Sequence, residues 1–156
     1  MTTIARLYYA TFRCDNLLTE WGGALLNLGL RLYLGWIFFK AGLTKIQDWD
    51  TTVLLFTEEY QVPLLSPEVA AVMGAGGELL LPPLLVLGLL ARPAALGLFV
   101  VNLMAVVSYP QLFGLECPAA LNDHRYWGIL LLVLLAFGPG KFSLDALAVG
   151  RNGRTP

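Results

Sequence analysis

Four apolar stretches recur along the chain, separated by shorter polar segments. They cover roughly residues 22–46, 69–91, 94–114 and 126–137. A helix needs about 20 apolar residues to cross ~30 Å of hydrocarbon, and the first three stretches meet that length. The fourth is shorter, so it is either thinned at one end or extended by the residues before it. The pattern predicts an all-α, integral membrane four-helix bundle.

The chain before the first apolar stretch also has a helical pattern. Leu7, Ala10 and Cys14 recur at a spacing of three to four residues, which is typical of a helix lying in the membrane interface. The predicted parts of the chain are an interfacial helix at 1–21, a transmembrane domain at 22–146 and a flexible cytoplasmic tail at 147–156.

Shorter helices are predicted outside the apolar stretches. The segment TTVLLFTEEY, residues 51–60, is too short to span a bilayer but apolar enough to enter the outer headgroup layer,. Thr51 or Thr52 could cap such a helix. Gly138 should end the fourth helix, and Ser143 could cap a short helix in the tail.

Composition and charge support the membrane assignment and orient the chain. Hydrophobic residues make up 57% of the 156 residues, charged residues 13%, and the mean hydropathy is +0.67; a soluble domain is more polar. Most cations fall on one side of a four-span topology: Arg6, Arg13, Arg92, Lys141, Arg151 and Arg154. Cations favour the cytoplasmic side, so both termini are expected there. A net charge of -1 gives no reason to expect nucleic acid as a partner,.

Charged residues inside the first two spans are the main functional candidates. Arg31, Gly35, Gly42 and Lys45 fall on one helical stripe, and its glycines favour close helix packing,. Arg31 is therefore expected to point into the bundle at about the depth of Glu78. An unpaired charge at that depth would cost several kcal/mol, so the sequence predicts an Arg31–Glu78 ion pair. This pair could be static or could belong to a ligand or proton site.

Residues near Glu78 extend the predicted polar cluster. Pro82 and Pro83 should kink the second span and leave carbonyl groups without helical partners,. Asn102 and Tyr109 share a face of the third span. Asn102 could bond the Glu78 carboxylate, although an ordinary interhelical hydrogen bond is favoured. Arg31, Glu78, Asn102 and Tyr109 form the predicted buried cluster or ligand site.

A second group of candidates lies at the outer mouth of the bundle. For several of its members a structural role, such as anchoring the helix at the membrane surface, is favoured over a functional one. Its residues are Lys40, Lys45, Asp123, His124 and Arg125. The two lysines can reach the aqueous layer with their long stems. His124 could bind a metal with Glu116 and Cys117, but the spacing matches no specific ligand pattern, so a surface or capping role is favoured.

Three segments together resemble the DoxX family of small four-helix membrane proteins. They are LRLYLGWIFFKAGLTKI, GELLLPPLLVLGLLARPAALGLFVVNLMAV and HRYWGILLLVLLAFGPGKFSLD. The likeness covers about residues 28–146. The stretches FFKAGLTKIQDWD, EYQVPLL, SYP and DHRYWG resemble a subgroup that accompanies bufferin-type, metal-responsive secreted peptides. The resemblance implies a multi-pass protein of the bacterial inner membrane, with a protein partner encoded nearby.

Two functions are compatible with this resemblance. The first is a non-catalytic binding, export or maturation component for a small secreted, metal-binding peptide. The second is a membrane subunit of a quinone-linked thiosulfate or thiol oxidoreductase, or of a related stress-response complex, with a ligand at Arg31 and Glu78. The sequence has no haem or flavin motif and no CxxC pair, which favours the first. It leaves open whether the protein is an enzyme, and whether it forms a homo-oligomer.

Overall fold

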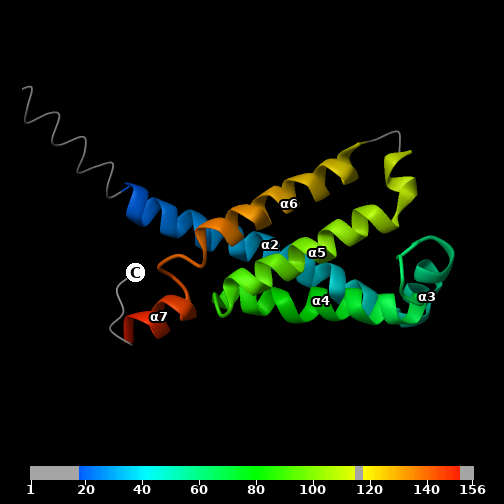
Figure 1. The fold of residues 1–156 in the computed structure, drawn as a ribbon, viewed down its shortest axis with the longest axis horizontal. Coiled ribbons are helices and arrows are strands. Elements are labelled where there is room, and N and C mark those ends of the chain that lie inside the picture. The colour runs from blue at the N-terminus through cyan, green and yellow to red at the C-terminus, as the bar shows by residue number, and fades with distance from the viewer. Residues whose placement is uncertain (1–17, 115–117, 152–156) are drawn as a thin grey trace, which may run out of the picture.

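The computed structural model of this chain describes residues 18–114 and 118–151, and every element in these ranges is helical (Figure 1). Most of the predicted interfacial helix at 1–21, the last residues of the tail, and Glu116 and Cys117 lie outside them. The elements are η1 (Leu18–Gly22), α2 (Gly23–Gln47), α3 (Trp49–Glu58), α4 (Pro67–Leu87), α5 (Ala91–Ser108), η2 (Pro110–Phe113), α6 (Ala119–Phe137) and α7 (Leu144–Arg151).

Three segments among the described residues are long and apolar enough to cross a membrane. They are Leu18–Gln47, Pro67–Leu87 and Ala91–Ser108. The helix α6 is extended at its beginning, as one of the two alternatives predicted, but its first turns carry Asp123, His124 and Arg125, which lower its hydropathy. The multi-pass membrane assignment is therefore confirmed, whereas a fourth crossing stays a prediction.

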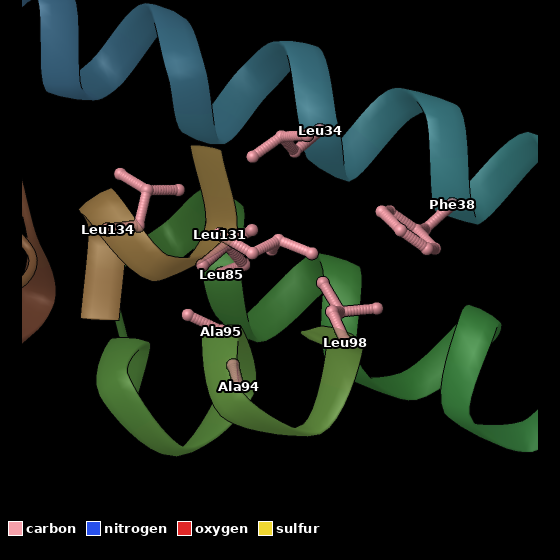
Figure 2. Close-up of a cluster of buried hydrophobic side chains, with 8 residues drawn as sticks. All are labelled: Leu34, Phe38, Leu85, Ala94, Ala95, Leu98, Leu131 and Leu134. Atoms are coloured by element: carbon pink, nitrogen blue, oxygen red, sulfur yellow. The ribbon is translucent and has the colours of Figure 1, made fainter. Parts of the chain in front are cut away.

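One hydrophobic core joins α2, α4, α5 and α6 (Figure 2). Leu34 of α2, Leu85 of α4, Leu98 of α5 and Leu131 of α6 are all fully buried within it. In contrast, large apolar side chains such as Trp36 are exposed around the outside. Monomeric soluble proteins rarely expose so much apolar surface, so this outer surface fits contact with lipid.

The helices α2 and α4 pack closely, in opposite directions, through the predicted glycine stripe. A Cβ atom at Gly35 would lie 3.6 Å from the Pro82 carbonyl oxygen, and one at Gly42 would lie 3.0 Å from the Glu78 Cβ atom. Rising numbers along α2 thus meet falling numbers along α4. This register decides which charges can meet.

We expect Gly42→Ala to destabilise the protein by about 1–3 kcal/mol, because its Cβ atom would lie 2.8 Å from Leu79 Cγ in a packed interface,. Gly29→Ala is the matched control, because Gly29 lies on the same helix with open space around it. It should be neutral or stabilising by up to about 1 kcal/mol. Thermal unfolding of both variants in one detergent tests this, and equal effects would contradict the tight α2–α4 contact.

The short helix α3 lies at one end of the molecule and α7 at the other (Figure 1). The prediction that Thr51 or Thr52 caps α3 is wrong. Asp48 is the N-cap and accepts a hydrogen bond from the Thr51 amide at 3.1 Å, and hydrogen bonding to Thr51 lowers the pKa of Asp48. Thr52 is buried instead, and its hydroxyl donates to the Lys45 carbonyl oxygen at 2.9 Å.

Candidate functional site

Glu78 forms a buried ion pair, but its partner is Lys45. The Lys45 Nζ atom lies 2.6 Å from Glu78 Oε2. The Glu78 side chain is 9% exposed and that of Lys45 is 24% exposed. A buried salt bridge is thus confirmed, whereas the predicted Arg31–Glu78 pairing is wrong.

The partner differs because the ends of α2 and α4 are not level. Lys45 lies in the last turn of α2, whereas Glu78 lies in the middle of α4. The first half of α4 therefore continues beyond α2, and α3 packs along it, with Phe56 beside Gly74. The sequence-based depths were counted from the start of each apolar stretch, as if α2 and α4 ended at the same level in the membrane. That assumption placed Arg31 opposite Glu78.

Arg31 is 1% exposed and binds backbone carbonyl groups near the other end of the helices. Its Nη1 atom donates to the Val86 carbonyl oxygen at 3.3 Å, and its Nη2 atom donates to the Phe142 carbonyl oxygen. Val86 lies in the last turn of α4, where carbonyl groups lack helical partners. Arg31 therefore joins the end of α4 to the segment before α7.

Two further side chains complete this connection, which we call the C-terminal clamp: Asn27, Arg31 and Asp145. The Asp145 carboxylate accepts hydrogen bonds from the Leu90 and Ala91 amides, both at 3.0 Å, at the start of α5. The Asn27 amide donates to the Gly138 carbonyl oxygen at 2.9 Å. The clamp therefore fixes the chain after α6 against the α4–α5 turn.

Local turns prepare the backbone for the clamp. Gly88, at a φ of 66°, ends α4: its amide bonds the Leu85 carbonyl and the Leu89 amide bonds that of Leu84, as in a Schellman motif. The Ser143 hydroxyl accepts the Ala146 amide at 3.1 Å, so the predicted cap of the tail helix is confirmed.

Asn102 forms hydrogen bonds with His124. The alternative prediction, in which Asn102 bonds the Glu78 carboxylate, is wrong. The Asn102 Nδ2 atom donates to the His124 carbonyl oxygen, and Asn102 Oδ1 meets His124 Nδ1, both at 2.9 Å. Both polar atoms of the Asn102 side chain thus contact α6. This is the interhelical hydrogen bond that the sequence favoured.

Two neighbouring cavities meet at these polar groups. The larger has a volume of about 510 Å³ and lies among the end of α2, α3, α4, α5 and α6. The smaller is about 250 Å³ and reaches Lys40 and Asn102. The residues that line both are Ala41, Glu78, Val101, Ala105, His124 and Trp127. The ion pair and the histidine therefore border one continuous region.

The larger cavity is mainly apolar, with a few polar groups on its wall. Tyr60 and Tyr109 pack edge to face there, with ring centroids 5.3 Å apart. Burial raises the pKa of Tyr60, so its hydroxyl stays protonated. Ser108 is 3% exposed, and its Oγ atom has no hydrogen-bond partner among the described residues. An unpaired buried hydroxyl is unfavourable, so a ligand atom could satisfy it.

The structure separates the residues predicted to form one site. Glu78, Asn102 and Tyr109 border the cavities, whereas Arg31 belongs to the clamp. Lys45 and His124, which were predicted at the outer mouth, also line the larger cavity and so belong to the site. Lys40 borders the smaller cavity, while Asp123 and Arg125 are exposed, and Arg125 bonds Asn122 at 3.3 Å.

Aromatic residues that the sequence did not single out line much of the site. Trp36, in the first span, is 64% exposed on the outer surface. Phe56, Tyr60 and Trp127 line the larger cavity instead. The available signal was the spacing of Phe56 and Tyr60, which are four residues apart and so lie on one side of the helix predicted at 51–60; in the structure Tyr60 follows the end of α3.

The sequence also offers a weak candidate metal site at Glu116, Cys117 and His124. Glu116 and Cys117 lie outside the described residues. Within the described residues no group of three or more His, Cys, Asp or Glu side chains could hold a metal ion.

Comparison with known proteins identifies the family. The model of the DoxX family matches residues 26–110, which cover most of α2 and all of α3, α4 and α5. This chain belongs to the DoxX family. It is also similar to an uncharacterised protein of Haemophilus influenzae, 31% identical over 131 residues, which covers 81% of this chain and 85% of that protein. No solved structure matches the chain.

The family match includes residues of both the C-terminal clamp and the cavities. The matched residues of this DoxX chain include Arg31, Lys45, Glu78 and Asn102, whereas His124 and the rest of α6 lie beyond the match. The match confirms the predicted family. The resemblance to the subgroup that accompanies bufferin-type peptides stays a prediction.

Proposed function

We propose that this DoxX protein is a multi-pass protein of the bacterial inner membrane, with α6 as a fourth span and both termini in the cytoplasm. The exposed apolar residues Ile129, Leu132 and Phe137 support the crossing by α6. The end near α7 carries Arg92 and Lys141, as expected of a cytoplasmic side,. The end near α3 carries the acidic residues Asp48, Asp50, Glu58 and Glu68.

Within this topology, we propose that the protein binds a small, mainly apolar ligand from the lipid phase, without catalysing a reaction by itself. The larger cavity carries this proposal. Ligand sites are typically cavities of about 300–1,000 Å³ with apolar walls and a few polar groups. A cavity of about 510 Å³ bordered by the Lys45–Glu78 pair, Ser108 and His124 fits this description. A ring with oxygen substituents, as in a quinone, has suitable size and polarity.

The ligand site is compatible with either predicted role. In a quinone-linked complex, the protein would hold the quinone and a partner subunit would supply the redox centre. In a peptide-export complex, the exposed acidic residues near α3 would attract a cationic partner. The cavity is direct support for ligand binding. The peptide-export role is supported only by the acidic residues near α3.

We expect Ala105→Phe to lower the affinity for a short-chain ubiquinone analogue by roughly tenfold or more, since the added ring would fill space that Ala105 now borders,. The matched control is Leu103→Phe, on the same helix but exposed on the outer surface. It should change affinity by less than about twofold. Binding is measured by titration of the purified protein in detergent. No saturable binding, or equal loss in both variants, would contradict the proposal.

A further inference from the structure

The contacts between Asn102 and His124 determine which ring nitrogen carries the proton. The Asn102 Nδ2 atom must face the His124 carbonyl oxygen, because an amide oxygen there would oppose another acceptor,. The Asn102 Oδ1 atom therefore faces His124 Nδ1 at 2.9 Å. Because this oxygen only accepts hydrogen bonds, Nδ1 must carry a hydrogen. The neutral ring then has a bare Nε2 atom with a free lone pair.

The His124 ring is held in place where a ligand would bind. It is half-buried, borders both cavities, and packs edge to face on Trp127 with ring centroids 5.0 Å apart. No side chain or backbone group in residues 18–114 and 118–151 is hydrogen-bonded to Nε2. Because the ring borders both cavities and Asn102 occupies Nδ1, Nε2 is the ring nitrogen left for a ligand there.

The other polar groups favour a neutral ligand over an ion. Lys45 and Glu78 already neutralise each other at 2.6 Å, so their summed charge attracts neither sign strongly. Ser108 Oγ is the buried hydroxyl without a described partner, and a hydroxyl can both donate and accept. Ser108 lines the same cavity as His124, so its hydroxyl is available to a second polar atom of a ligand bound there.

We propose that the cavity selects a neutral, hydroxyl-bearing ring compound of the phenol class, whose O–H donates to His124 Nε2. This inference rests on the proposed ligand-binding function and goes beyond it by naming the chemical group that is recognised. Asn102 is a positioning residue in this arrangement, because it sets the tautomer through the other ring nitrogen. A ligand that offers only acceptors, such as an ether or the oxidised form of a quinone, would face the lone pair of Nε2 without this hydrogen bond, so it should bind more weakly than its hydroxyl-bearing counterpart, such as the quinol.

A matched pair of probes tests the selection: 4-hexylphenol and its methyl ether, 4-hexylanisole, which has the same ring and chain but no hydroxyl hydrogen. The wild-type protein should bind the phenol roughly five- to tenfold more tightly than the ether, as one net hydrogen bond provides. In His124→Phe the ratio of the two affinities should fall to the ratio with which the two probes partition into detergent micelles without protein. Equal affinities in the wild type would overturn the selection.

The chain has a single histidine, so nitrogen-15 NMR of histidine-labelled protein, with any purification tag removed, reports on His124 directly. Wild-type protein should show a protonated Nδ1 and a bare Nε2. The phenol should shift the Nε2 signal and the ether should not, and Asn102→Leu should abolish the preference for this tautomer. A wild-type ring protonated on Nε2 would overturn the inference even if His124→Phe fails to fold.

The outcomes separate this inference from the function on which it rests. If neither probe binds saturably, and Ala105→Phe changes nothing, the ligand-binding function itself is wrong. If both probes bind equally well and Ala105→Phe weakens both, the cavity is a ligand site but His124 does not select hydroxyl groups.

Discussion

Lys45→Met is expected to lower the free energy of unfolding by about 3 kcal/mol, because it leaves the Glu78 carboxylate buried without a counter-ion,. Glu78→Gln should cost less, about 1–2 kcal/mol, since the Lys45 side chain is 24% exposed and its ammonium group can reach water,. The two single variants therefore predict an asymmetry that follows from burial. Denaturant unfolding in one detergent measures it.

The double variant Lys45→Met/Glu78→Leu provides the sharper comparison. Replacing both charges with apolar groups removes the buried unpaired charge, so the double variant should be more stable than Lys45→Met alone. Lys40→Met is the matched control on the same helix, because Lys40 is exposed; it should change stability by about 0.5 kcal/mol or less. A Lys45→Met variant as stable as the control would show that the pair contributes little.

The positions of the helices follow from the sequence because long apolar stretches in a membrane protein have few alternatives. With no water to bond the backbone, such a stretch must be helical. The end of such a helix can be predicted where the sequence has a glycine that can adopt a positive φ. Gly138, which ends α6 at a φ of 77°, is an example. The Ser143 cap was likewise predicted from the residue type.

The charge pairing could not be predicted in the same way, because it depends on how far one helix extends past another. The glycine stripe correctly placed Arg31, Gly42 and Lys45 on the face that packs against α4. Nothing in the stripe shows which of its two cations lies opposite Glu78. That choice follows from the register of the two helices, in which the first half of α4 extends past the end of α2 and packs against α3.

The cavity could be predicted still less, since it depends on several side chains that are far apart in the sequence. Asn102 and Glu78 were assigned to one buried cluster by depth and helix face, and both border the smaller cavity, although they are not bonded to each other. His124 was expected at the surface because it lies among charged residues at the start of α6. In the structure it is half-buried and bonded to Asn102 of α5, a contact that helical periodicity alone does not specify.

The second large effect is expected at Arg31, because this buried cation bonds two carbonyl groups that have no other described donor. Arg31→Met should lower the free energy of unfolding by about 3–4 kcal/mol, since hydrogen bonds to charged groups contribute about 1.5–3 kcal/mol each,. Arg31→Lys should be intermediate, as a single ammonium group does not reproduce the planar fork of a guanidinium. The control is Arg125→Met, at an exposed arginine, with an effect of about 0.5 kcal/mol or less,.

A readout specific to the clamp is cleavage by trypsin after Lys141, which precedes Phe142 and is itself exposed. In the wild type, Arg31 and Asp145 hold this segment against the α4–α5 turn. Arg31→Met should therefore raise the cleavage rate by roughly tenfold or more, because the open state becomes more populated by that factor for each 1.4 kcal/mol lost. Lys45→Met should leave the local opening of the tail unchanged, so its cleavage rate should stay within about twofold of the wild type.

The same variants distinguish the two possible partners of Glu78. If Glu78 pairs with Lys45 alone, the effects of Arg31→Met and Glu78→Gln should add within about 0.5 kcal/mol, as they do for sites without shared contacts,. If Arg31 and Glu78 formed an ion pair in the bilayer, the double variant would be more stable than the sum of the single effects by 1 kcal/mol or more. Additivity would therefore establish Arg31 as part of the fold and leave Lys45, Glu78 and His124 as the polar groups available to a ligand.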